Sequence, residues 1–516
     1  MIAKTYLVGM DLGTTNIKAI ITDSEGNLIA SASRPNSLIV QGHGMAEQDA
    51  NEWWANAVSI FKEITEKAGQ EVVGNIKCIS VSSQTVSMLP VDRDGRPLRN
   101  ALIWMDERSA GELYDILDKV GRDRFIQIVG GQPAVAFLSN KLLWFKRNEP
   151  ELFEKTDKVL QASSYINMKL TGEKTMDIDQ ASRCQCLDIS TFKWSDEIAA
   201  AMEMDLNEIL PEPRKITDVI GHVTKEAAEE TGLAEGIAVV AGASDAMASM
   251  YATGLSKLDE ATESSGTTSL VFCGTDKASA NDVPVVTKPC AIEGMPYVFD
   301  APINASGASI KWFLDTLGHE EITIAGEKGI NVYDYINELA LETVPGSHNL
   351  FYFPYLGGER APLWNSYSRG MFIGLTQATT RADMVRSVFE GTAFAVRHVI
   401  ETIKESGAAP KALRITGGGA KSRTWCRIKA SMLNMPVLIL DEGSGDVPVG
   451  DILIAGSGVG VFDNLTEAMD KFIKVKEVIE PDPEWTKVYD KMYPYYVDMY
   501  RHLDSDLAKM EKELSL

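Results

Sequence analysis

The sequence predicts an α/β protein built from two related domains. Its 516 residues are enough for two domains with cores of their own. Strand-like apolar runs alternate with helical segments along the chain, which is typical of α/β folds. The tripeptide Gly-Thr-Thr occurs at residues 13–15 and 266–268, each time between two strand-like runs. This repetition indicates a duplicated unit, and we assign the domains to residues 1–250 and 251–516, with the boundary between 246 and 262.

The first elements follow from short-range patterns. Residues 6–8 and 19–21 are apolar runs of strand length, and residues 27–33 predict a third strand that completes a meander. Residues 49–69 predict a helix with Asp49 as its N-cap and with Glu52 completing a capping box. A further strand is expected over residues 76–82, ending at Ser83 and Gln84.

The segment "GMDLGTTNIKAIITD" interrupts the first predicted hairpin with small polar residues. Gly13 allows the backbone to approach a ligand, so that N–H groups and the hydroxyls of Thr14 and Thr15 can face a phosphate. Lys18 would add positive charge, and Asp11 at the strand end could hold a metal ion through water. An ordinary turn explains the same residues, so this segment alone leaves both interpretations open.

The second half of the chain repeats this pattern in "ESSGTTSLVFCGTD". A strand over residues 412–416 then leads into three glycines and a helix that starts at Ser422. With one such hairpin in each domain, the two can face each other across a cleft and hold a polyphosphate between them. The tail from Pro481 predicts a closing helix that packs on the core through Leu503, Leu507, Met510 and Leu514.

Composition excludes several classes of protein. The net charge of −23 argues against a broad nucleic-acid surface and against binding to acidic membranes. No apolar run is long enough to span a bilayer, and the N-terminus shows no signal-peptide pattern, so a cytoplasmic protein is expected. The six cysteines and six histidines are scattered. We therefore expect reduced thiols and no catalytic metal held by clustered His or Cys ligands.

Five segments together carry a family resemblance. These are DLGTTNIK, GASDAMA, SSGTT, TGGGAKSRTW and GMFIGLTQATTRADMVRSVFE. They resemble the FGGY carbohydrate kinases over essentially the whole chain, and residues 46–49, 141–144 and 417–422 are most similar to the xylulokinase branch. The resemblance implies two actin-like, ribonuclease H-like ATPase domains with a cleft between them. It also implies ATP-dependent phosphorylation of a hydroxyl of a pentulose or related sugar, with D-xylulose as the first choice.

The resemblance also assigns site residues. Asp245 in GASDAMA corresponds to the base that accepts the proton of the sugar hydroxyl, although its residue type alone favours a helix N-cap. Asp11 and Asp245 would hold Mg²⁺ through water. The residues implied for ATP binding come from both hairpins and from two later segments: Gly13, Thr14, Thr15, Lys18, Gly266, Thr267, Gly307, Lys311, Gly418, Gly419, Ala420 and Arg423.

The implied sugar pocket contains Gln84, Thr85 and Trp104 together with Asp245. Here the sequence departs from the xylulokinase pattern. Residues 84–87 are Gln-Thr-Val-Ser where xylulokinases typically have Gln-Met-His-Gly, and Ala246 stands where relatives carry an amide side chain. Two polar contacts to a sugar are therefore missing, which predicts weaker discrimination among sugars.

Several alternatives stay open at this point. Within the family they are a gluconate kinase, for which the segment around Arg360 is a similarity, and a polyol kinase acting on erythritol- or glycerol-like substrates. Outside it they are an actin- or chaperone-like ATPase and a non-catalytic sugar sensor. A small-molecule sugar or polyol is the expected partner, with no nucleic acid and no membrane, and a homodimer is one option for the assembly.

Overall fold

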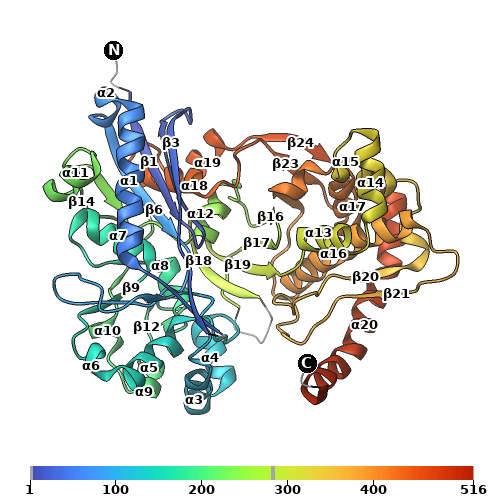
Figure 1. Ribbon diagram of the computed structural model, residues 1–516, viewed down its shortest axis with the longest axis horizontal. Coiled ribbons are helices and arrows are strands. Elements are labelled where there is room, and N and C mark those ends of the chain that lie inside the picture. The colour runs from blue at the N-terminus through green and yellow to red at the C-terminus, as the bar shows by residue number, and fades with distance from the viewer. Residues whose placement is uncertain (1–3, 43, 280–284, 515–516) are drawn as a thin grey trace.

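The computed structural model describes residues 4–42, 44–279 and 285–514, which form two lobes, each built on one central sheet with helices around it (Figure 1). Helices on these described residues are all too short or too polar to cross a membrane. The α/β, two-domain architecture expected from the repeated hairpins is confirmed.

The first sheet has the strand order β14-β15-β6-β1-β2-β3. The first three strands form the predicted antiparallel meander, and β6 and β15 continue the sheet in parallel with β1. Its strands are β1 Tyr6–Leu12, β2 Asn16–Asp23, β3 Leu28–Pro35, β6 Ile76–Ser83, β14 Val219–His222 and β15 Ala238–Val240.

The second sheet repeats this design, in the order β18-β19-β17-β16-β22-β23-β24. Strand β16 pairs antiparallel with β17 and parallel with β22, as β1 pairs with β2 and β6. The predicted duplication is therefore present in the strand pairing. These strands are β16 Glu260–Ser265, β17 Ser269–Thr275, β18 Val286–Ile292, β19 Met295–Ile303, β22 Ala412–Thr416, β23 Val437–Leu440 and β24 Val475–Ile479.

Short strand pairs lie outside the two main sheets. They are β4 Ile39–Gly42, β5 Met45–Gln48 and β8 Ala101–Leu102 in one group, then β7 Leu89–Val91 with β9 Lys158–Leu160, β10 Met176–Asp177 with β13 Pro213–Arg214, β11 Leu187–Asp188 with β12 Lys193–Trp194, and β20 Phe351–Phe353 with β21 Met371–Ile373.

Helix α1 fills the position predicted for it and buries Trp53 against the first sheet. Asp49 is its N-cap and accepts a hydrogen bond from the N–H of Asn51. The predicted capping box is wrong, because the carboxylate of Glu52 accepts instead from the N–H and hydroxyl of Ser37. The helices of this half are α1 Ala50–Ala68, α2 Gln70–Val73, α3 Ala110–Val120, α4 Arg122–Val129, α5 Leu138–Asn148, α6 Pro150–Phe153, α7 Ala162–Thr171, α8 Ile178–Arg183, α9 Asp196–Met202, α10 Leu206–Ile209, α11 Lys225–Thr231 and α12 Asp245–Tyr251.

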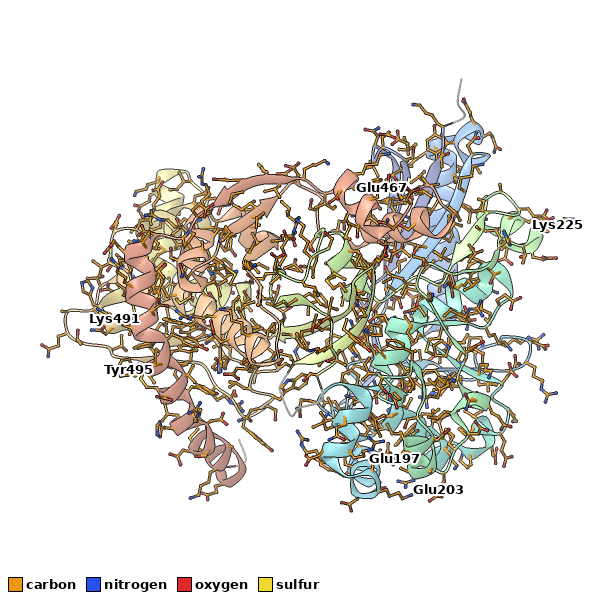
Figure 2. The ribbon with its side chains drawn as sticks, turned by 180° about the vertical axis from the view of Figure 1, so that it is seen from behind. Glu197, Glu203, Lys225, Glu467, Lys491 and Tyr495 are labelled. Carbon is orange, nitrogen blue, oxygen red and sulfur yellow. The ribbon has the colours of Figure 1, made fainter. Side chains whose placement is uncertain are left out.

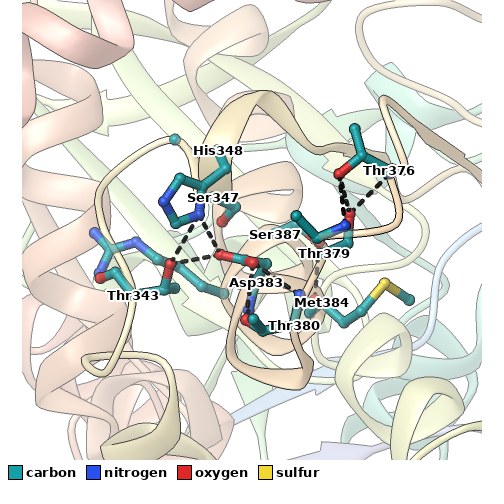
Figure 3. A network of polar contacts seen from close by, with 12 residues as sticks. Thr343, Ser347, His348, Thr376, Thr379, Thr380, Asp383, Met384 and Ser387 are labelled. Atoms are coloured by element: carbon teal, nitrogen blue, oxygen red, sulfur yellow. Dashed lines mark hydrogen bonds and ion pairs between the residues drawn. The ribbon is translucent and has the colours of Figure 1, made fainter.

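The long helix α16 lies at the centre of the second lobe. Its N-terminus is held by the network in Figure 3, in which the buried carboxylate of Asp383 accepts from Thr343, Thr380 and His348. Burial alone would raise the pKa of Asp383, but these hydrogen bonds outweigh it and lower the pKa to about 2. The remaining helices are α13 Gly307–Thr316, α14 His319–Lys328, α15 Val332–Leu339, α16 Arg381–Glu405, α17 Arg423–Leu433, α18 Val447–Gly458, α19 Leu465–Phe472 and α20 Pro483–Leu514, with 3-10 turns at Ser347–Asn349 and Gly418–Lys421.

Helix α18 belongs to the end of the chain but packs on the first sheet, and α19 packs against α18. A Cβ on Gly9 of β1 would lie 2.3 Å from the carbonyl oxygen of Pro448, so only glycine permits this approach. Below it, the buried carboxylate of Asp451 accepts from the hydroxyls of Ser80 and Ser82 on β6, at 2.9 and 2.6 Å. Residues beyond the predicted boundary thus complete the core of the first lobe, and the division at residue 250 stays a prediction.

Helix α20 confirms the predicted closing helix, and Leu507 packs against the second core as predicted, although the most buried residues lie earlier in the helix. Tyr489 and Tyr496 are buried in the second core, and Met510 is 45 % exposed. Met510 therefore does not belong to a buried face as predicted, and the side chain of Leu514 lies outside the described residues. Seen from behind, Lys491 and Tyr495 lie on the outer side of this helix (Figure 2).

Candidate active site

The turn between β1 and β2 is closed by its own backbone and by the chain that leaves β3. The N–H of Gly13 donates to the carbonyl of Asn16 at 2.9 Å. Asn36 donates from its N–H to the carbonyl of Thr15 and from its side chain to the carbonyl of Gly13, at 2.8 and 3.1 Å. The turn is thereby fixed, and the side chain of Thr15 is exposed and available to a ligand.

The hydroxyl of Thr14 faces the predicted sugar residues. It donates to Oε1 of Gln84 at 3.0 Å and accepts from the indole N–H of Trp104 at 3.0 Å. The amide of Gln84 donates in turn to Oε1 of Gln48 at 2.5 Å. The sequence placed Thr14 among the phosphate residues, whereas its hydroxyl bonds to two residues that were predicted for the sugar pocket.

Acidic side chains gather below this turn. Burial raises the pKa of Asp11 well above its usual value, and the charges of Asp245 and Asp446 raise it further. Lys18 forms an ion pair with Asp446 at 2.5 Å, so its ammonium group is shared with an acid that the sequence analysis did not identify. Within the described part of the chain, Oδ1 of Asp11 is buried without a hydrogen-bond partner. A hydrated divalent cation is the kind of group that suits such a carboxylate.

Asp245 is the first residue of α12. The N-cap is Ser244, whose hydroxyl accepts from the N–H of Met247 at 3.2 Å, so the N-cap alternative for Asp245 is wrong. Burial raises the pKa of Asp245 to about 6. A backbone bridge between Ser83 and Ser244 places the start of α12, and with it Asp245, next to the end of β6, where Gln84 follows.

A pocket of about 760 Å³ lies beside the second Gly-Thr-Thr turn. The start of α13 is joined to this turn, because the N–H groups of Gly307 and Ala308 donate to the carbonyls of Gly266 and Thr267, both at 3.0 Å. Six of the residues predicted for ATP binding line this one pocket: Gly266, Thr267, Gly307, Lys311, Gly418 and Gly419.

Two residues of the second half that were predicted for ATP binding are not among those that line this pocket. Ala420 packs against the second core, and Arg423 forms an ion pair with Glu477 on β24 while its side chain is 74 % exposed. The pocket adds residues to which the sequence analysis gave no role, although Phe389 and Trp425 lie within its quoted segments: they are on α13, α15, α16 and α17, namely Trp312, Tyr333, Asn337, Phe389 and Trp425. Apolar spacing places such residues on helices but does not show which of them face a cavity.

Around the predicted sugar residues, Gln84 is buried and Trp104 is 44 % exposed. Thr85 lies between these extremes. Val86 has φ of 55° and is 2 % exposed, so this β-branched residue adopts a left-handed conformation and packs inward. Its side chain therefore adds no polar group to the pocket, as its sequence predicted.

Two repeated domains, a nucleotide-sized pocket and a carboxylate next to a second polar site define a phosphotransferase of the actin-like class. The models of the N-terminal and C-terminal domains of the FGGY family of carbohydrate kinases match residues 6–252 and 261–459. The chain belongs to this family and is an ATP-dependent sugar kinase.

Individual relatives resemble the chain over nearly its full length. A xylulose kinase of Staphylococcus epidermidis is 29% identical over 503 residues, which cover 96% of this chain and 97% of that protein. The structure of a xylulose kinase from Rhodospirillum rubrum matches with a TM-score of 0.89 and 28% identity, covering 98% of this chain and 100% of the other. A gluconate kinase structure from Lactobacillus acidophilus matches with a TM-score of 0.88 and 26% identity, covering 98% and 99%.

Proposed function

We propose that the protein transfers the γ-phosphoryl group of ATP to a hydroxyl of D-xylulose or a closely related pentulose. The observation that supports this most is the position of Asp245: it follows Ser244, which bridges Ser83 next to Gln84, and its charge acts on Asp11 by raising the pKa of that carboxyl. The choice of D-xylulose rests on the similarity to proteins described as xylulose kinases. We also propose a cytoplasmic enzyme, and the net charge of −23 argues against a nucleic-acid partner.

In this proposal Asp245 orients the sugar hydroxyl and accepts its proton while the oxygen attacks the γ-phosphorus and the bond to the β-phosphate oxygen breaks. Thr15 and Thr267 contact the phosphates from the two turns. Glycine at 266, 307, 418 and 419 lets the nucleotide lie close to the protein backbone. Magnesium, held through water by Asp11 and Asp245, would neutralise phosphate charge. Trp104 and Gln84, fixed by Thr14, would line the sugar.

The test is an ADP-release assay against pentuloses, polyols and sugar acids, with wild type and Asp245→Asn. We expect D-xylulose to give the highest kcat/KM, and Asp245→Asn to lower kcat about 100-fold or more, because general-base catalysis contributes roughly that much. ADP binding should be unchanged. Asp498→Asn, an exposed substitution on α20, is the matched control and should behave as wild type. Near-normal turnover of a folded Asp245→Asn protein would remove this residue from the mechanism.

Sugar acids are the second candidate class. The buried carboxylate of Glu359 accepts from the backbone N–H groups of Asn304 and Arg360, at 2.7 and 2.8 Å. The guanidinium of Arg360 instead donates from Nε to Oδ1 of Asn304 at 2.6 Å, on the chain between β19 and the nucleotide pocket. A cation held in this way could bind a carboxylate. A kcat/KM for gluconate above that for D-xylulose in the same assay would favour this class.

A further inference from the structure

Arg183 lies at the end of α8 and links the two halves of the molecule. Its Nε donates to Oδ1 of Asp179 on the same helix at 3.0 Å, and its Nη1 donates to Oδ2 of Asp300 on β19 at 2.9 Å. These three side chains are buried, with exposures of 8 %, 1 % and 7 %. A guanidinium presents its donors in a rigid fork, so one side chain can hold two carboxylates in a fixed geometry.

The first of these carboxylates leads to the proposed base. Oδ2 of Asp179 accepts from the N–H of Ser244 at 3.0 Å. Ser244 is the N-cap of α12, and the next residue is Asp245. The position at which α12 begins is therefore tied to Asp179, and through it to Arg183.

The second carboxylate leads to the nucleotide pocket. Asp300 lies on β19, and the chain that leaves β19 reaches the start of α13 within a few residues. Gly307, the first residue of α13, lines the pocket and is hydrogen-bonded to the second Gly-Thr-Thr turn. The strand that carries Asp300 thus supports one wall of the nucleotide site.

We propose that Arg183 is a positioning residue that couples the nucleotide-binding half of the enzyme to the base. This inference rests on the proposed role of Asp245. Arg183 keeps its charge in the buried site, whereas burial and the neighbouring Arg183 lower the pKa of nearby Lys288 to about 7. Removing either partner of a buried ion pair leaves a charge without compensation, so the linkage is sensitive to single substitutions.

The direct test is hydrogen exchange in the segment 242–248, which contains the N–H that Asp179 binds. In wild type, saturating MgADP is expected to slow exchange of this segment, since nucleotide orders β19 and α13. In Asp300→Asn the slowing should fall to about one third or less of the wild-type factor, while MgADP still binds. Glu260→Gln is the matched control, because it breaks the Arg414–Glu260 ion pair between strands β16 and β22, within the same sheet. It should leave the slowing unchanged.

Kinetics give a second measurement. Asp300→Asn and Arg183→Lys are both expected to lower kcat about tenfold while KM for ATP stays within about twofold, because misplacing the base affects the transition state more than the bound ground state. Arg183→Lys keeps the positive charge but loses the planar guanidinium that binds two carboxylates at once. If Asp300→Asn does not fold, Arg183→Lys takes its place in the exchange test.

Equal slowing by MgADP in wild type and in these variants would overturn the coupling. A kcat that stays at the wild-type value would overturn it as well. The exchange test needs no sugar and no turnover. Failure of wild type to use D-xylulose would therefore count against the proposed substrate and leave the linkage to be decided by exchange.

Discussion

The two Gly-Thr-Thr turns have the same sequence but differ in how they close, because the N–H of Gly13 donates to the carbonyl of Asn16 and that of Gly266 to the carbonyl of Thr268. The first is held by Asn36 after β3, and its Thr14 hydroxyl is bound between Gln84 and Trp104. The second is held by the start of α13 and opens on the nucleotide pocket. The same tripeptide thus connects two strands in both domains, whereas the chain that follows β3 in one domain and β19 in the other determines what surrounds each turn.

The largest effect that tests this comparison is expected at Gly307. A Cβ at this position would lie 2.4 Å from the carbonyl oxygen of Gly266, so alanine must push α13 away from the second turn. We expect Gly307→Ala to weaken ADP binding by about 3 kcal/mol, the upper end of what over-packing costs. Gly326→Ala on α14 is the control, since a Cβ there meets open space. Calorimetric titration with MgADP measures both, and equal affinities would show that this contact does not shape the pocket.

A smaller effect should separate the two turns by ligand. Thr14→Val removes the group that Gln84 and Trp104 share, and Thr267→Val removes a hydroxyl at the nucleotide pocket. Each loss is expected to be about 1 to 2 kcal/mol. Thr14→Val should raise KM for the sugar and leave KM for ATP unchanged, and Thr267→Val should do the reverse. If both variants change KM for ATP alone, the two turns have the same role and the comparison fails.

The smallest effect lies outside both turns, at the start of α16. The pKa of Asp383 is lowered from 3.8 to about 2 in the folded protein, so its ionised form stabilises the fold above about pH 4. That contribution is lost as the pH falls from about 4 to about 2. Asp383→Asn should therefore lower the melting temperature at pH 7 and approach wild type at pH 2.5. Its kcat and both KM values at pH 7 and 20 °C should equal those of wild type, and a change in either KM would connect this network to the cleft.

Much of the fold could be predicted because strand pairing within each half is encoded locally. The meander of residues 6–35 and the repeated Gly-Thr-Thr turn both follow from short apolar runs and turn chemistry. The packing of α18 on β1 was missed, because nothing near Gly9 marks a partner more than 400 residues away. The predicted capping box is absent because the carboxylate of Glu52 accepts two hydrogen bonds from Ser37, which is distant in the sequence.

The candidate site was predicted unevenly for the same reason. Asp245 and the glycines around the nucleotide pocket lie in short motifs, so their positions were identifiable. Asp446 and Tyr333 carry no such motif, and only the folded chain brings them to the cleft. Lys18 was assigned to phosphate because its ion-pair partner is far along the sequence, and its charge was therefore counted as free.

The docking of α18 on the first sheet has a consequence for the order of events during synthesis. The face of β1 and β6 that this helix covers is apolar around Leu7 and also holds the two serines that bind Asp451. While only the first half of the chain has left the ribosome, this face of the sheet has no helix to cover it. The first sheet is thus covered only after Gly458 has emerged from the ribosome, and until then its apolar face is open to aggregation unless a chaperone binds it.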